Sequence, residues 1–165
     1  MSSYTLSLHR APVKGLLLLV VVAIAARIAF VGFMPHVYSK DLHAWLRVID
    51  LLQAGGNPYR ETSVLNWPPF WMNVLFGIGK LSGWWGVSAT VLIQGLLTMA
   101  EVVVMAVVWW VSLRLLQKDL FRPLLVGWAL NPVCIFLSCQ HANFDVFAGL
   151  WVLLAAGALL AFYKA

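Results

Sequence analysis

The sequence predicts an all-α protein, a polytopic bundle of about four transmembrane helices with further helices beside the membrane. Hydrophobic residues make up 62% of the 165 and charged residues only 10%, and the mean hydropathy is +0.89. Soluble domains of this size usually carry far more charge. Apolar runs also approach the roughly 20 residues that a helix needs to cross a bilayer. A membrane is therefore the expected solvent.

Four segments have the length and composition of a span. The first follows a basic N-terminus and could pass for a signal peptide as far as Ala26, but Arg27 interrupts it and the apolar run resumes to Phe33. An uncleaved first span is the better interpretation. The expected crossings are about 15–33, 87–111, 123–139 and 146–163.

Charge placement decides how to treat 67–85, which is apolar enough to span but contains prolines, glycines and a lysine. If it lies outside as an interfacial helix, six basic residues are cytoplasmic (Arg10, Lys14, Arg114, Lys118, Arg122 and Lys164) and four are external (Lys40, Arg47, Arg60 and Lys80). If it spans, three are cytoplasmic and seven are external. Because cytoplasmic loops are enriched in Lys and Arg, we predict four spans and a cytoplasmic N-terminus, in a bacterial plasma membrane or a eukaryotic endoplasmic reticulum. No basic run indicates a nucleic-acid partner.

This topology makes residues 1–165 one transmembrane domain, with an external loop at 34–86 and a second at 140–145 on the same non-cytoplasmic face. In the first loop, Ser39 is a candidate N-cap for a helix from Asp41 to Gln53, and the sequence GGNPY at 55–59 ends that helix. Its apolar stripe is expected at Leu42, Trp45, Ile49 and Leu52, and its polar face at His43, Arg47 and Asp50.

Asp41 is the candidate catalytic base. A carboxylate at a membrane surface can accept a proton from an attacking hydroxyl or help to hold a divalent cation. The alternative is structural, since an acid in the first turn also favours the helix dipole. The sequence indicates no other cofactor, and a divalent cation at Asp41 stays open.

A second candidate group, His141, Asn143 and Asp145, follows the third span. If the helix continues past Gln140, His141 and Asp145 are four residues apart and could share a metal, a phosphate or a sugar hydroxyl. The alternative is a polar helix end at the interface, with an Asn-Pro kink at 131–132.

Two charges lie inside the predicted spans. At the helical rise, Arg27 is about 9 Å from the outer end of its span and Glu101 about 20 Å from the outer end of its own, so a direct pair between them is not expected. A lipid phosphate could reach Arg27, and we expect Glu101 to hold the bundle together or to be a protonated buried acid. Outside, Arg60 and Lys80 could hold anionic headgroups or simply snorkel.

The order of these features resembles the N-terminal part of the GT-C glycosyltransferases, polytopic enzymes that use polyprenyl-phosphate-linked sugars. The resemblance lies in an early external acid (Asp41), a loop helix, GGNPY at 55–59, an aromatic-Pro-Pro element at 67–69, a span, and an Asn-Pro helix that ends in HANFD at 141–145. The likeness is closest to the mannosyltransferase-like and glucosyltransferase-like branches and covers about 15–163.

This resemblance implies an inverting transferase that works on the non-cytoplasmic face. Asp41 would activate an acceptor hydroxyl, on a lipid or a glycan, for attack on the anomeric carbon of a polyprenyl-phosphate-linked sugar. The turn at 141–145 matches the family's second external loop, where contacts to sugar, phosphate or metal are expected. With the charged residues above, the candidate substrate-binding residues are His43, Arg27, Arg60, Lys80, His141, Asn143 and Asp145.

The chain departs from the family at two points. His43 stands where some members carry a second carboxylate, which puts metal dependence in doubt. The family also has further spans, so we expect a fragment, a split half or a degenerate copy with weak or no transferase activity alone, and the missing half would be a partner. Two other functions stay open: a non-catalytic membrane subunit that binds lipid or a partner protein, and a small transporter that uses Glu101 and Asp145.

Overall fold

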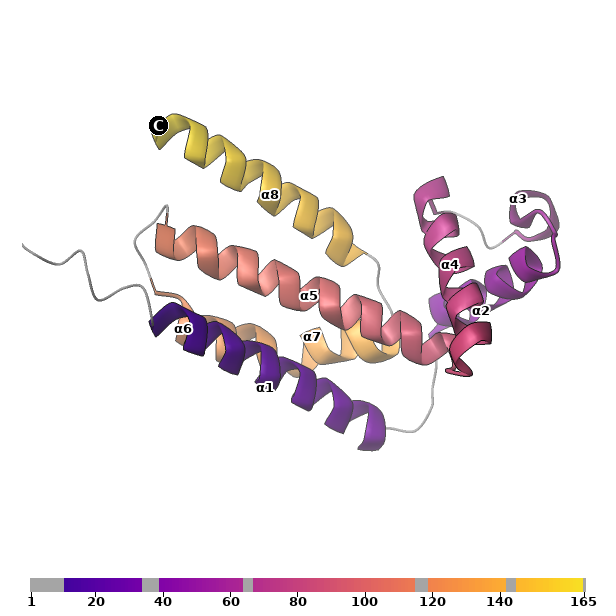
Figure 1. Ribbon diagram of the computed structural model, residues 1–165, viewed down its shortest axis with the longest axis horizontal. Helices are drawn as coiled ribbons and strands as arrows, with labels where there is room; N and C mark the ends of the chain where they lie inside the picture. Colours follow the sequence, from indigo (N-terminus) through magenta and orange to yellow (C-terminus); the bar gives the residue numbers. More distant parts are fainter. Residues whose placement is uncertain (1–10, 34–38, 64–66, 115–118, 142–144, 165) are drawn as a thin grey trace, which may run out of the picture.

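The computed structural model describes residues 11–33, 39–63, 67–114, 119–141 and 145–164, and every regular element within these ranges is a helix (Figure 1). The all-α prediction is therefore confirmed for this part of the chain. Three helices are long and apolar enough to cross a membrane without a break: α1 (Ala11–Phe33), α5 (Ala89–Arg114) and α8 (Asp145–Lys164).

The predicted crossing at 123–139 consists of two segments that meet at a bend of 50°, and we call it the bent span. In its first half, α6 (Phe121–Leu124) continues into the π-helix η1 (Leu125–Ala129). In its second half, α7 (Pro132–Phe136) continues into the π-helix η2 (Leu137–His141). The described residues thus hold three helices that are long and apolar enough to span, or four if the bent pair is one crossing, and the fourth crossing stays a prediction.

Asn131 and Pro132 form the break in the bent span. Proline has no backbone N–H to continue the helical ladder. The Asn131 side chain caps the new helix, because its Oδ1 accepts from the Val133 N–H at 2.9 Å, and its Nδ2 donates back to the Gly127 carbonyl at 3.1 Å. The predicted kink at 131–132 is confirmed.

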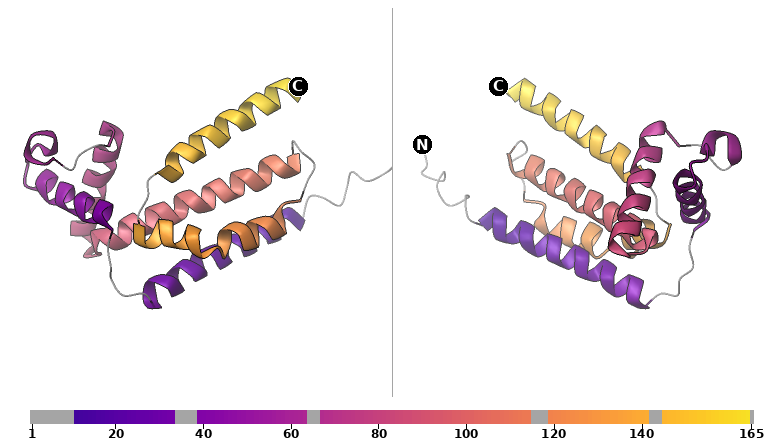
Figure 2. Two further views of the ribbon diagram at one scale, coloured as in Figure 1. Left: turned by 180° about the vertical axis from the view of Figure 1, so that it is seen from behind. Right: turned by 45° about the vertical axis from the view of Figure 1, so that its right-hand side comes forward.

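The spans run side by side, with α5 at the centre (Figures 1 and 2). Helix α5 contacts α1, α8 and η2, and α1 also contacts both π-helices of the bent span. Helices α1 and α5 and the first half of the bent span share a cluster of buried residues, which we call the span core: Leu19, Ala23, Val102, Met105, Trp109, Leu124 and Ala129.

Three further helices lie together at one end of the bundle, and we call them the cap: α2 (Lys40–Gln53), α3 (Pro58–Glu61) and α4 (Pro69–Trp85). Helix α4 packs on α2 and runs across the direction of the spans (Figures 1 and 2). Helix α4 is therefore not parallel to the spans, and this orientation agrees with an interfacial helix at 67–85. Its position at a membrane surface stays a prediction.

The start and the two faces of α2 agree with the sequence pattern. The Ser39 hydroxyl accepts from the Leu42 N–H at 3.1 Å and caps the helix, which begins at Lys40. Gly55 turns the chain with a φ of 77° just after the helix ends. The predicted stripe is buried at Leu42, Trp45 and Ile49 and half-buried at Leu52, while His43, Arg47 and Asp50 are exposed.

Helix α5 joins the cap to the spans. Its early residues Ile93 and Leu97 are buried in the core of the cap, whereas Val102, Met105 and Trp109 belong to the span core. The residues of the cap core are Leu42, Trp45, Val48, Ile49, Trp71, Met72, Leu75, Ile78, Ile93 and Leu97. The first turns of α5 thus extend past the end of α1 and into the cap (Figure 1).

Candidate active site at the end of the bundle

Asp41 lies in the first turn of α2, at the end of that helix nearest the spans (Figure 1). Its side chain is half-buried and makes no hydrogen bond or ion pair to another residue in the described part of the chain. The neighbouring His43 is exposed, and its Nδ1 lies 2.9 Å from the Ser39 carbonyl oxygen. The N-terminal position favours a carboxylate, and Asp41 keeps its oxygens available to a proton donor.

The C-terminal end of η2 and the start of α8 lie at the same end of the bundle (Figure 1). Helix η2 ends at His141 and contacts α2, and α8 begins at Asp145. In the first turn of α8, the Phe147 ring lies 5.9 Å from the ring of Trp71, which is in the first turn of α4. Both η2 and α8 therefore contact the cap near their ends at His141 and Asp145.

Within this turn, His141 and Asp145 belong to two different helices, so they do not share one helical face as a continuous helix would require. Asp145 is exposed at the start of α8. Asn143 lies outside the described residues, and only the backbone of His141 is described.

Arg60 and Lys80 are exposed at the other end of α2 from Asp41. Arg60 lies in α3, which follows the C-terminus of α2. Lys80 follows Gly79, whose backbone is packed against Gln53 and Ile49 in the second half of α2. The Lys80 ammonium lies 5.3 Å from the centre of the Phe76 ring, in a cation–π contact. The structure thus separates these two cations from the first turn of α2.

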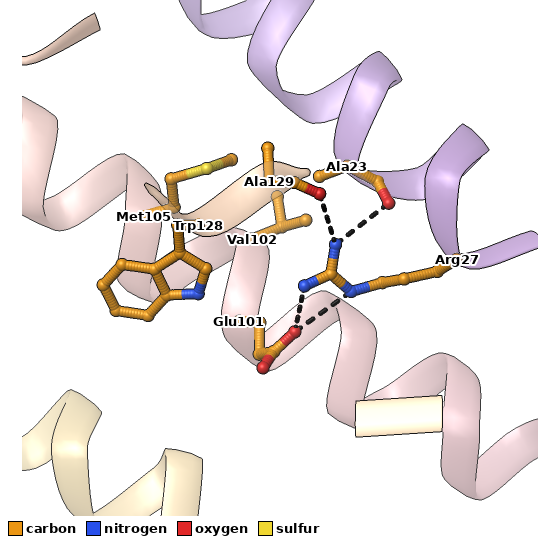
Figure 3. Close-up of a pocket in the computed structure, with 7 residues that line it drawn as sticks. All are labelled: Ala23, Arg27, Glu101, Val102, Met105, Trp128 and Ala129. Atoms are coloured by element: carbon orange, nitrogen blue, oxygen red, sulfur yellow. Dashed lines mark hydrogen bonds and ion pairs between the residues drawn. The ribbon is translucent and has the colours of Figure 1, made fainter. Parts of the chain in front are cut away.

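Arg27 turns into the bundle, where it pairs with Glu101 (Figure 3). Its Nε donates to Glu101 Oε2 at 3.0 Å and its Nη2 donates to the same oxygen. Only 2% of Arg27 and 8% of Glu101 are exposed. The prediction that the two do not pair is therefore wrong. The prediction that Arg27 binds a lipid phosphate is also wrong, because its guanidinium is buried against Glu101 and out of reach of a headgroup.

The predicted depth of Glu101 assumes that α1 and α5 end at one level, and in the structure they do not. Because the stretch from Ala89 to Leu97 belongs to the cap, about 12 Å of α5 lies beyond that level at the helical rise. Glu101 then comes level with Arg27.

Two polar residues that the sequence analysis did not single out complete these contacts. Ser138 of η2 accepts from Arg27 Nε at 3.1 Å, and Gln94 of α5 donates to the Cys139 carbonyl. Both stand inside apolar runs, where a polar side chain usually bonds to another helix. Their position inside apolar runs is the sequence feature that could have identified them as contacts between helices.

Within the described ranges, no three His, Cys, Asp or Glu side chains come together as metal ligands. Comparison of the chain with protein-family models, curated proteins and solved structures finds no match. Function is therefore inferred from the residues and their geometry.

Proposed function

We propose that the chain is a membrane glycosyltransferase, or one part of one, that transfers a sugar from a polyprenyl-phosphate donor to an acceptor hydroxyl on the non-cytoplasmic face. One observation carries the proposal: the first turn of α2, with Asp41, lies at the same end of the bundle as the end of η2 and the start of α8, and α2 contacts η2. A donor whose lipid tail lies along the spans presents its phosphate and sugar at that level. The order of sequence features shared with GT-C enzymes supports the same activity.

In the proposed reaction, Asp41 is the general base. Its carboxylate takes the proton of the acceptor hydroxyl as the oxygen attacks the anomeric carbon. The new glycosidic bond forms on the face opposite the leaving group, the bond from the anomeric carbon to the phosphate oxygen breaks, and polyprenyl phosphate leaves with the electron pair. The product has the inverted configuration.

The remaining candidate residues divide by position. The sugar or the phosphate is assigned to His43, in the first turn of α2, and to His141, Asn143 and Asp145, because η2 contacts α2. Arg60 and Lys80 are better suited to anionic headgroups, because they lie at the other end of α2. Arg27 is not proposed to contact substrate, since its guanidinium is buried against Glu101.

The test is sugar transfer in membranes of the source organism, with the chain deleted and then restored as wild type or variant. This format supplies any partner that the chain requires. Asp41→Asn is expected to lower the rate of transfer by about 10²-fold to 10⁴-fold, the usual contribution of a general base. The matched control is Asp50→Asn, an exposed acid of the same helix. Full transfer with Asp41→Asn, or an equal loss in both variants, contradicts the assignment.

A second candidate, a non-catalytic membrane subunit, is favoured by the exposure of α8. This helix packs along α5 with Gly157, whose backbone approaches Val111, while the small residues beside it are exposed. Such a surface suits close contact with another helix. If this is the function, Ala156→Leu abolishes transfer by the assembled complex and Asp41→Asn leaves it intact.

The geometry favours a transporter least. Glu101 is bound to Arg27, and the crevice that these two residues line with Ala23, Trp128 and Ala129 is too narrow to admit a water molecule.

A further inference from the structure

The break in the bent span leaves a backbone carbonyl without its helical donor. In an unbroken helix the Ala129 carbonyl would accept from the Val133 N–H, but that group donates to the Asn131 side chain instead. A carbonyl left unpaired among apolar side chains is costly, and inside a bilayer water does not replace the lost partner. The bend therefore needs a donor from elsewhere in the chain.

Arg27 supplies that donor (Figure 3). Its Nη1 lies 3.4 Å from the Ala129 carbonyl oxygen and 3.0 Å from the Ala23 carbonyl oxygen of its own helix. Glu101 holds the other edge of the guanidinium through Nε and Nη2. Because the guanidinium is planar and is held on two edges, its orientation is fixed.

The same guanidinium also reaches the second half of the bent span. Ser138 accepts from Arg27 Nε at 3.1 Å, and its hydroxyl lies 3.1 Å from the Cys134 carbonyl oxygen and 3.2 Å from that of Ile135. Arg27 is thus bonded to Ala129 before the break and to Ser138 after it. One side chain spans the bend.

The angle of this bend controls where η2 ends. Seven residue steps separate Pro132 from Cys139, a lever of about 10 Å at the helical rise, so a change of about 20° moves its end by about 3–4 Å. Gln94 holds that end through the Cys139 carbonyl, and η2 contacts α2. A change in the bend therefore reaches the cap.

From these contacts we infer that Arg27, held by Glu101, is a positioning residue that sets the angle of the bent span and thereby the separation between Asp41 and the end of η2. The catalytic consequence rests on the proposed function, whereas the geometric one does not. Arg27 acts on the site through η2 and touches no substrate.

The geometric part is tested by a distance between two spin labels, at Arg47→Cys in α2 and Phe136→Cys at the end of α7, both exposed positions. The background carries Cys134→Ala and Cys139→Ala. Arg27→Leu with Glu101→Leu removes the bridge and both buried charges together. The matched control is Thr90→Val with Ser112→Ala, which removes two other buried polar groups of α5.

The wild type and the control are expected to give one narrow distance distribution. The double leucine variant is expected to give a distribution that is broader or shifted by about 2 Å, because the second half of the bent span is no longer fixed and Phe136 lies about 6 Å from the bend. A folded double leucine variant with the wild-type distribution overturns the inference. If that variant does not fold, the same distance is measured in Arg27→Lys and in Ser138→Ala. Each of these variants removes part of the bridge and leaves Glu101 in place.

Sugar transfer separates positioning from general stability. In folded Arg27→Lys, kcat is expected to fall by about 10-fold to 100-fold with KM unchanged, because misplacement of reacting groups by about 1 Å has effects of that size. A shifted distance with unchanged kcat overturns the positioning role. Absence of transfer in every sample, the wild type included, refutes the proposed function instead, and the distance measurement then decides the geometric part alone.

Discussion

Arg27 of α1 and Glu101 of α5 are 74 residues apart in sequence and joined by a 3.0 Å hydrogen bond inside the bundle. Both are buried, and the same guanidinium bonds to the bent span. The pair thus ties together α1, α5 and the bent span. Two charges removed from water are stabilised mainly by each other, so the loss of one partner is more damaging than the loss of both.

Glu101→Leu alone is expected to destabilise the protein by about 3–5 kcal/mol, because it leaves the Arg27 charge buried without a partner. Arg27→Leu together with Glu101→Leu is expected to recover most of that loss. Chemical unfolding in detergent micelles measures both, with the exposed Arg47→Leu as the control. A double variant less stable than Glu101→Leu would contradict this expected recovery.

The close approach of α4 to α2 depends on Gly79. A Cβ there would lie 2.9 Å from Ile49 Cγ2 and 2.8 Å from Gln53 Nε2, whereas a Cβ at Gly77 meets nothing within 4 Å. Gly79→Ala is expected to destabilise the cap by about 1–3 kcal/mol through overpacking. Gly77→Ala, on the same helix, is expected to stabilise it by about 0.5–1 kcal/mol, since glycine weakens a helix interior. Thermal unfolding followed by helical circular dichroism compares the two, and equal effects would contradict the contact at Gly79.

The Ser39 cap fixes the turn that carries Asp41. Ser39→Ala is expected to cost about 1 kcal/mol, the usual value of an N-cap, and to speed hydrogen exchange at the Leu42 amide that the hydroxyl holds. Ser63→Ala, an exposed serine outside the helices, is the control. Unchanged exchange at Leu42 in the Ser39 variant would contradict the capping role.

Much of this fold follows from local rules. The stripe of α2 could be predicted because its apolar residues recur with the helical period between a capping serine and two glycines. The bend at 131–132 could be predicted because proline lacks the N–H that the ladder requires.

The orientation of Arg27 could not be predicted in this way. Helix α1 is apolar all round, so its sequence carries no asymmetry to show which face meets the other helices. Its pairing with Glu101 depends on how far α5 extends into the cap, and that is set by the burial of Ile93 and Leu97 against α2 and α4. Such a register between helices is a tertiary property.

The turn at 141–145 shows the same limit of local patterns. The spacing of His141 and Asp145 suited one continuous helix, but η2 ends at His141 and α8 begins at Asp145. Each residue is therefore oriented by a different helix. The structure does show that η2 contacts α2 at one end of the bundle.

Helix α4 is expected to lie at the membrane interface. Phe70, Phe76 and Trp84 are exposed along one side of it, while Trp71 and Leu75 are buried on the other. Aromatic residues and a snorkelling lysine are typical of the headgroup level.

The depth of α4 can be measured with a spin label at Trp84→Cys, by its collisions with oxygen and with a water-soluble nickel complex. We expect a depth between that of a label at Ile28 in α1 and one at Ser63 in the cap, both exposed positions. A depth equal to that of Ile28 would place α4 in the hydrocarbon and contradict the interfacial assignment.

The most direct test concerns which side of the membrane the two parts of the site occupy. In a background without cysteines, Lys40→Cys, beside Asp41, and Asp145→Cys, at the start of α8, are treated with a membrane-impermeant maleimide in intact cells. Arg122→Cys, in the first turn of the bent span, reports the other end of the bundle. We predict that positions 40 and 145 react in intact cells and that position 122 reacts only after permeabilisation. Reaction of positions 40 and 145 from opposite sides would contradict a single site at the cap.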